Sequence, residues 1–306
     1  TDIKSLKKAA RQTIGPELER RIQTVIETGL IELHDDFKIY WNKSSIGKLI
    51  AGRDYLNPNI DLLVDDILEQ NQRQKLINFL EKWIKNKINN ILKSLLDLKD
   101  LREKNSSIKA LAYQLYENNG VLKREQVFEY LKDLGQDERK ILRDLGVKFG
   151  RYHVFLHKLI KPEAVSLRTL LWKNYHQKYF NLKPPTFGLN FLDGNEIQNK
   201  DFMLLCGFEK FNKFYVRIDI LERLFVQIIN SNLQKENEIK MIPEMLNLLG
   251  CNKDNFKKLL KNMNYKIVEK DDDVYFKYFP KKNLKKPNKK ILKENPFGVL
   301  KNLNFN

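Results

Sequence analysis

The feature that most constrains the fold is a long amphipathic repeat between Asn71 and about Leu98. Asn71 and Gln74 have the three-residue spacing of a capping box, which marks the beginning of a helix. A helix of this length usually bridges or braces domains, and a coiled coil is the alternative. Apolar residues recur along the repeat at spacings of three and four, which places them on one side of the helix: Leu76, Leu80, Ile84, Ile88, Ile91, Leu92 and Leu95.

Residues 1–56 are expected to form helices followed by a small β-sheet. The helical pattern over residues 4–28 is interrupted at Gly15-Pro16, where proline can occupy the first turn of a new helix. After Gly29, short apolar runs on either side of the acidic pair Asp35-Asp36 favour strands.

Residues 57–180 are expected to contain the long helix and a first winged-helix-like unit. Between residues 107 and 157 the pattern predicts three short helices and then a hairpin around Gly150, which is the order of a winged helix. A further helix is predicted from Glu163 to about Tyr179. Pro184-Pro185 cannot continue that helix, so residues 181–200 are expected to be a linker.

Residues 201–280 repeat this plan and are expected to form a second winged-helix-like unit. Helices are predicted over 218–229, 241–249 and 254–263, and two strands flank the sequence KDDD. The predicted fold class is therefore mainly α with small β-hairpins (α+β), with two winged-helix-like units and a long bracing helix.

The charge of the chain favours an acidic partner. It carries 56 Lys+Arg against 39 Asp+Glu, a formal net charge of +17, and its 42% hydrophobic residues exclude disorder over the whole length. Residues 281–306 hold eight lysines and one glutamate, so we expect a basic, disordered tail there.

Composition also indicates the cellular location of the protein. No apolar run reaches the 18 or so residues of a membrane span, and Cys206 and Cys251 lack the spacing of a disulfide framework or zinc site. These features predict a cytoplasmic protein without a membrane partner. Because the chain begins with Thr1, we expect it to be a piece of a longer protein.

Phosphate-loop chemistry is not predicted. Gly47-Lys48 resembles the end of such a loop, but Asn42 stands in place of its first glycine and Leu49 in place of its magnesium-binding Ser or Thr.

Metal chemistry is not predicted either. Asp65-Asp66 is expected to be a solvated strand end or turn, and Asp271, Asp272 and Asp273 a polar hairpin turn. His153 and His157 lie in a predicted strand and lack a nearby cysteine, so they are expected to be packed or surface residues. We expect no catalytic residue, metal or cofactor in this chain.

Binding chemistry is the remaining prediction. In the helix from Asp254 to Met263, a projection at 100° per residue places the lysines opposite the apolar residues, so they can face phosphates. The alternative is an ordinary solvated helix face. The predicted nucleic-acid-binding residues are Lys257, Lys258 and Lys261, together with Lys281, Lys282, Lys285, Lys286, Lys289 and Lys290 of the tail.

Three segments carry a family resemblance: DERKILRDLGVKFGRYHVFLHKLIKPEAVSLRTLLW, IGKLIAGRDYLNPNIDLLVDD and NPFGVLKNL. Together they resemble the region after the motor domains of alphaproteobacterial helicase-related proteins, which are superfamily 2 ATP-dependent helicases similar to the mitochondrial degradosome RNA helicase. The pair His157-Lys158 departs from the family pattern, which has a proline-containing pair there.

The resemblance implies that the ATP-binding and arginine-finger motifs, and with them ATP and magnesium, belong to motor domains N-terminal to Thr1. The chain alone is expected not to hydrolyse ATP. We expect an accessory region that grips or guides RNA or single-stranded DNA for motor domains of the same polypeptide. The alternatives are a stand-alone winged-helix DNA-binding transcriptional regulator and a protein-docking scaffold.

Overall fold

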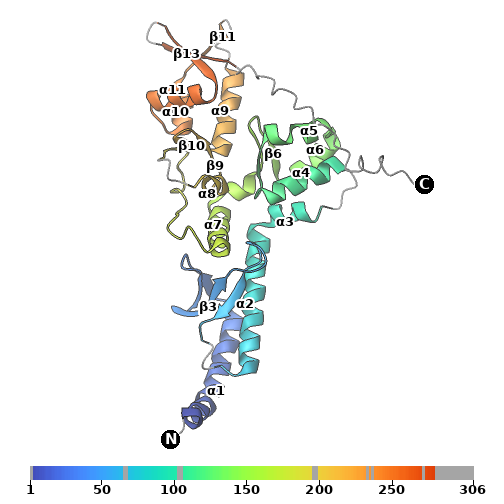
Figure 1. The fold of residues 1–306 in the computed structure, drawn as a ribbon, viewed down its shortest axis with the longest axis vertical. Coiled ribbons are helices and arrows are strands. Elements are labelled where there is room, and N and C mark those ends of the chain that lie inside the picture. The colour runs from blue at the N-terminus through green and yellow to red at the C-terminus, as the bar shows by residue number, and fades with distance from the viewer. Residues whose placement is uncertain are drawn as a thin grey trace, which may run out of the picture. The chain divides into compact units, whose positions relative to one another are not determined.

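The computed structural model describes residues 3–64, 68–101, 106–194, 199–231, 234–235, 238–270 and 273–279 (Figure 1). The chain divides into two compact units, which are described separately. The first comprises Thr1–Asn230 and Glu244–Cys251, and the second Ser231–Pro243 and Asn252–Asn306. Helices predominate in the described residues, and the strands form small antiparallel sheets, which confirms the α+β class. The predicted basic tail lies outside the described residues.

The first unit begins with a helix and a four-stranded antiparallel meander in the order β1-β2-β3-β4. A methyl group at Gly47 would approach Leu80 Cδ1 to 3.2 Å, so Gly47-Lys48 is a packing position in β3 and not a loop. The elements are α1 (Ile3–Thr28), β1 (Ile31–Leu33), β2 (Lys38–Trp41), β3 (Ser44–Ile50) and β4 (Asn59–Leu62).

The predicted long helix is two helices, α2 (Gln70–Ile91) and α3 (Lys93–Lys99), which meet at Leu92. The backbone of Leu92 leaves the helical region there, with φ −102° and ψ 18°. Helix α2 lies beside α1 and the meander (Figure 1). Its stripe of Leu76, Leu80, Ile84 and Ile88 is buried, as the spacing predicted.

The next part of the first unit packs three short helices on a three-stranded sheet of order β5-β7-β6. The helices and the hairpin were predicted, whereas β5 was not. Leu111, Leu115, Leu142 and Leu156 are fully buried in its core. The elements are α4 (Ser106–Glu117), β5 (Val121–Lys123), the 3-10 helix η1 (Arg124–Val127), α5 (Phe128–Lys132), α6 (Gln136–Asp144), β6 (Val147–Phe149) and β7 (His153–Leu156).

A second three-stranded sheet of the first unit has the order β8-β10-β9. Its strand β8 lies within residues 181–200, where a linker was expected, and Phe191 pairs with Val216 of β10. Its two adjacent apolar residues, Phe191 and Leu192, pair with Val216 and Tyr215. The elements are η2 (His157–Ile160), α7 (Pro162–His176), β8 (Phe191–Asp193), α8 (Lys200–Leu205), β9 (Phe208–Phe211), β10 (Phe214–Arg217) and α9 (Ile218–Asn230).

The second unit is built on a sheet of order β11-β12-β14-β13 with helix α11. Phe256 of α11 and Phe276 of β14 are fully buried and meet edge to face at 6.3 Å between ring centroids. The elements are β11 (Gln234–Lys235), β12 (Glu238–Lys240), α11 (Lys253–Asn262), β13 (Tyr265–Lys270) and β14 (Asp273–Tyr278); α10 (Pro243–Leu249) begins at the unit boundary.

One junction recurs three times in the described residues. Gly146, Gly207 and Asn264 each follow a short helix and precede the first strand of a hairpin, and their φ angles are 95°, 85° and 66°. This left-handed conformation turns the chain sharply and suits glycine or asparagine. The same local plan therefore leads into β6, β9 and β13.

Candidate nucleic-acid interface

Helix α11 carries the predicted binding lysines of the described residues. It begins at Asn252, whose side chain accepts a hydrogen bond from the Asn255 backbone N–H at 2.8 Å. Phe256, Leu259 and Leu260 are fully buried, so the apolar side of the helix is the side that the spacing predicted.

The three predicted lysines of α11 differ in their surroundings. Lys258 and Lys261 are exposed, whereas Lys257 is half-buried and its Nζ lies 2.6 Å from Glu269 Oε1 on β13. The hydrogen bond and charge of Lys257, with the nearby charges of Lys253 and Lys261, hold the pKa of Glu269 below its usual value. Lys257 is therefore engaged within the unit, and Lys258 and Lys261 are the lysines that solvent reaches.

The sheet beside α11 has a second basic surface, which sequence reasoning missed. Lys266 of β13 stands directly opposite Lys277 of β14, and both side chains are exposed. Side chains alternate across a strand, so one face of the sheet collects every second residue. We call this the lysine face: Lys240, Lys266, Lys270, Lys277 and the half-buried Tyr275.

Two acidic residues accompany the lysine face. Lys240 forms an ion pair with Asp273, whose hydrogen bond raises the pKa of Lys240, and Lys270 Nζ lies 2.7 Å from Glu238 Oε2. Lys270 also lies 5.8 Å from the Tyr275 ring centroid. The face therefore offers clustered ammonium groups beside one aromatic ring. The signal that could have located it is the even spacing within two strands: Lys266 and Lys270 are four residues apart in YKIVEK, and Tyr275 and Lys277 are two apart in DVYFKY.

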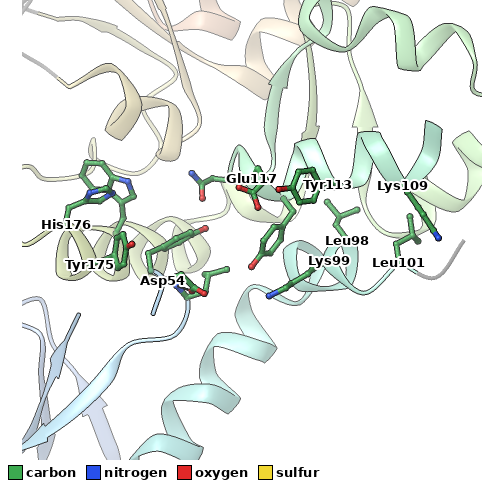
Figure 2. Close-up of a pocket in the computed structure, with 14 residues that line it drawn as sticks. Asp54, Leu98, Lys99, Leu101, Lys109, Tyr113, Glu117, Tyr175 and His176 are labelled. Atoms are coloured by element: carbon green, nitrogen blue, oxygen red, sulfur yellow. Dashed lines mark hydrogen bonds between the residues drawn. The ribbon is translucent and has the colours of Figure 1, made fainter. Parts of the chain in front are cut away.

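The first unit contains an aromatic cavity of about 630 Å³ (Figure 2). The loop between β3 and β4 contributes Asp54, Tyr55 and Leu56. Figure 2 shows Tyr175 and His176 coming from α7, and Tyr113 and Glu117 from α4. The other lining residues are Leu98, Lys99, Leu101, Lys109, Tyr116, Asn119 and Trp172.

The aromatic rings of the cavity are not all packed in the protein. Trp172 stacks on Tyr179 at 5.2 Å, and Lys99 Nζ lies 5.4 Å from the Tyr116 ring centroid. Tyr175 meets His176 edge to face at 5.3 Å but is still 38% exposed, and Tyr113 is 60% exposed. Two large rings therefore remain accessible in one concave site.

Buried charges stabilise the first unit away from this cavity. His153 Nε2 lies 3.1 Å from Glu209 Oε2, and Lys123 Nζ lies 2.8 Å from Glu209 Oε1. Glu222 of α9 accepts hydrogen bonds from the backbone N–H groups of Arg151, Tyr152 and His153. We call these side chains, Lys123, His153, Glu209 and Glu222, the buried clasp.

The pKa values within the clasp follow from its geometry. Burial lowers the pKa of His153, but the hydrogen bond with Glu209 and the charge of Glu222, 3.5 Å from Nδ1, outweigh burial and raise it. Burial raises the pKa of Glu209, but hydrogen bonds from His153 and Lys123 outweigh burial and lower it. The clasp therefore favours a charged histidine between carboxylates.

Arg168 of α7 is completely buried and donates hydrogen bonds to three backbone carbonyl oxygens. It donates to Asn119 at 2.8 Å, Leu159 at 2.6 Å and Leu205 at 2.8 Å. Burial lowers its pKa to about 10. Since Asn119 follows α4, this arginine ties the end of α4 to α7, and these two helices form opposite walls of the aromatic cavity.

Among the described residues, no three His, Cys, Asp or Glu side chains lie close enough together to hold a metal ion. His153 belongs to the buried clasp and His157 to η2, so they do not form a ligand pair, and Asp273 pairs with Lys240. The remaining acidic candidates at 65–66 and 271–272, and the six predicted lysines between 281 and 290, lie outside the described residues.

Comparison with known proteins leaves these surfaces to be interpreted from their chemistry. The chain matches no family model, no curated protein and no solved structure. Across the part of the chain that is described, no helix has the length and apolarity needed to cross a membrane.

Proposed function

We propose that this chain is the nucleic-acid-binding accessory region of an ATP-dependent RNA or DNA helicase. It grips or guides a strand for motor domains of the same polypeptide, and ATP and magnesium act in those domains. The observation that carries the proposal is the lysine face, where Lys266 and Lys277 are exposed and stand directly opposite each other on neighbouring strands.

Phosphate chemistry supports this assignment. A strand presents regularly spaced negative charges, and lysines that neutralise them release counterions, which makes the affinity salt-dependent. Lys258 and Lys261 of α11 are two further exposed lysines of the same unit, on the helix that packs against the opposite face of the sheet through Phe256 and Phe276. The overall charge of +17 adds long-range attraction for a polyanion.

The element order supports a winged-helix-like character for two regions. The run α4, β5, α5, α6, β6, β7 has a sheet order in which the last strand lies in the middle, as in a winged helix. In the second unit the run β12, α11, β13, β14 forms a sheet of order β12-β14-β13, again with the last strand in the middle. This order also favours the alternative of a stand-alone DNA-binding regulator.

A salt titration tests the proposal. Binding of the full chain to single-stranded RNA and DNA is measured at several salt concentrations for wild type and for Lys266→Gln with Lys277→Gln. The slope of log affinity against log salt should fall by roughly 0.7 for each lost phosphate contact. Lys82→Gln with Lys85→Gln, which removes two exposed lysines from α2, is the matched control and should leave the slope near wild type.

Three outcomes separate the alternatives. Equal slopes for both double variants would remove the lysine face from the interface. A strong preference for one duplex sequence over single strands would favour the regulator, and no binding to any nucleic acid would favour the protein-docking scaffold. Nucleic-acid-stimulated ATP turnover by the purified chain would contradict the assignment of catalysis to separate motor domains.

A further inference from the structure

The aromatic cavity has the composition of a site for a flat ring. Tyr113 on α4 and Tyr175 on α7 leave large parts of their rings in solvent, and both border the same cavity. Figure 2 shows them on opposite sides of it. Burial of apolar surface contributes about 25 cal/mol per Å² to binding. Two exposed rings that border one cavity therefore favour a ligand that stacks on them.

The size and charge of the cavity narrow the class of ligand. Its volume of about 630 Å³ lies within the range of small-molecule sites, which is roughly 300–1,000 Å³. Lys99 and Lys109 are exposed at the same cavity. The carboxylate of Asp54 is engaged by its own loop, since it accepts hydrogen bonds from Leu56 N and the Asn57 amide at 2.9 Å. The site thus combines stacking surfaces with cations, while one of its carboxylates is already engaged.

The walls of the cavity are held in place before any ligand arrives. Arg168 donates from α7 to the carbonyl of Asn119 at the end of α4, and to Leu159 before α7. The Arg168 side chain is completely buried, and its bond to Leu159 is well shielded from water. A preformed gap between two aromatic walls reduces the ordering cost of binding a planar group.

We propose that the aromatic cavity binds a nucleobase, stacked on Tyr113 or Tyr175, with the adjoining phosphate at Lys99 or Lys109. The inference rests on the proposed function for its source of the base, which is an unpaired nucleotide of a bound single strand. A free nucleotide has the same ring and phosphate chemistry and is the other source to be tested. Stacking on aromatic side chains tolerates any base, which suits a protein that grips strands of varied sequence.

The test compares strands that carry bases with strands that lack them. The full chain is titrated with a short oligothymidine, with an abasic strand of equal length, and with adenosine monophosphate. Wild type should bind the oligothymidine more tightly than the abasic strand. Tyr113→Ala with Tyr175→Ala should weaken oligothymidine binding by roughly 5- to 150-fold, the range for loss of one stacked base, and leave abasic binding unchanged.

Matched variants separate stacking from misfolding. Tyr113→Phe with Tyr175→Phe keeps both rings and should retain the preference for bases. Phe128→Ala removes an equally exposed ring that does not line the cavity and should bind as wild type. Lys266→Gln with Lys277→Gln should weaken both strands alike, because it alters phosphate contacts and not stacking. Thermal melting of each variant establishes that it is folded.

Each outcome decides the inference. If wild type binds both strands equally, or if the double alanine variant keeps the preference for bases, the cavity inference is overturned while the proposed function stands. If no strand binds but adenosine monophosphate does, and the double alanine variant loses it, the cavity holds a free nucleotide and the proposed function fails. If neither strands nor nucleotide bind, both proposals fail.

Discussion

The strands β5-β7-β6 in the first unit and β12-β14-β13 in the second have the same order in their sheets. The central strand of the first is buried on both faces, whereas the central strand of the second is buried on one face. The central strand β7 is buried at all four residues, because Phe155 and Val121 pack with Ile218 on the face away from the helical core. The central strand β14 buries Val274 and Phe276 on one face only.

The residues beside the two central positions show the difference directly. Phe155 is flanked by Val121 and Lys148, whereas Tyr275 is flanked by Lys240 and Val268. In the sheet of the first unit, the face that carries Phe155 packs against α9 through Ile218. The corresponding face of the other sheet is rich in lysine, and Lys266 and Lys277 are exposed on it. A shared topology therefore does not imply a shared role.

The largest expected effect comes from exchanging the two central rings for alanine. Phe155→Ala should lower the free energy of unfolding by about 3–5 kcal/mol, because it leaves a cavity in a closed core. Tyr275→Ala should lower it by about 1 kcal/mol or less, because the ring is half-exposed and solvent fills its place. Urea denaturation of both variants measures the difference. Equal losses would mean that the two sheets are buried alike.

A smaller loss is expected from opening the buried clasp. Glu222→Ala removes the acceptor of three backbone N–H groups at the β6–β7 turn and should cost about 2–3 kcal/mol, since partly buried donors lose their partner. Glu117→Ala, on the exposed end of α4, is the control and should change stability by about 0.5 kcal/mol or less. Similar stability of the two variants would contradict a structural role for the clasp.

The clasp should also give stability a pH dependence. The raised pKa of His153 contributes stability that is complete below its ordinary value of 6.5 and is lost as pH rises through the folded-state pKa. The lowered pKa of Glu209 contributes stability that is complete above 4.5 and is lost as pH falls through its folded-state pKa. Both contributions coexist between these two values.

Denaturation of wild type and Glu209→Gln across this pH range measures the effect. The stability difference between them should be largest between pH 4.5 and 6.5 and should shrink on both sides. The ion pair with Lys123 should keep part of the difference at higher pH. A difference that does not vary with pH would show that these two groups do not titrate differently on folding.

The smallest stability effect is expected on α11. Lys258→Glu with Lys261→Glu should change the free energy of unfolding by about 0.5 kcal/mol or less per site, because both side chains are exposed, whereas Phe256→Ala should cost about 3–5 kcal/mol. Strand affinity at low salt should fall in the lysine variant. An unchanged affinity would show that Lys258 and Lys261 do not belong to the interface.

The spacing of apolar residues predicted the helices correctly, but it did not predict the short strands or the buried clasp. The stripes of α2 and α11 were predicted because a helix buries residues three and four apart, which is a local property. Strands β5 and β8 were missed because three residues carry too little alternation, and β8 is defined by its pairing with β10. The clasp joins His153 to Glu209 and Glu222, which lie 56 and 69 residues away, so local patterns contain no signal for it.

The distance in sequence between Glu222 and the turn it holds has a consequence for synthesis on the ribosome. Chains are made from the N-terminus at about 5–20 residues per second, and domains generally fold as units when they emerge. The β6–β7 turn is complete some 70 residues before its carboxylate partner is made, as the Tyr152–Glu222 separation of 70 shows. For several seconds of translation its three N–H groups can bond only to water. The hairpin of the nascent chain should therefore become protected from hydrogen exchange in two steps, the second coinciding with the appearance of α9.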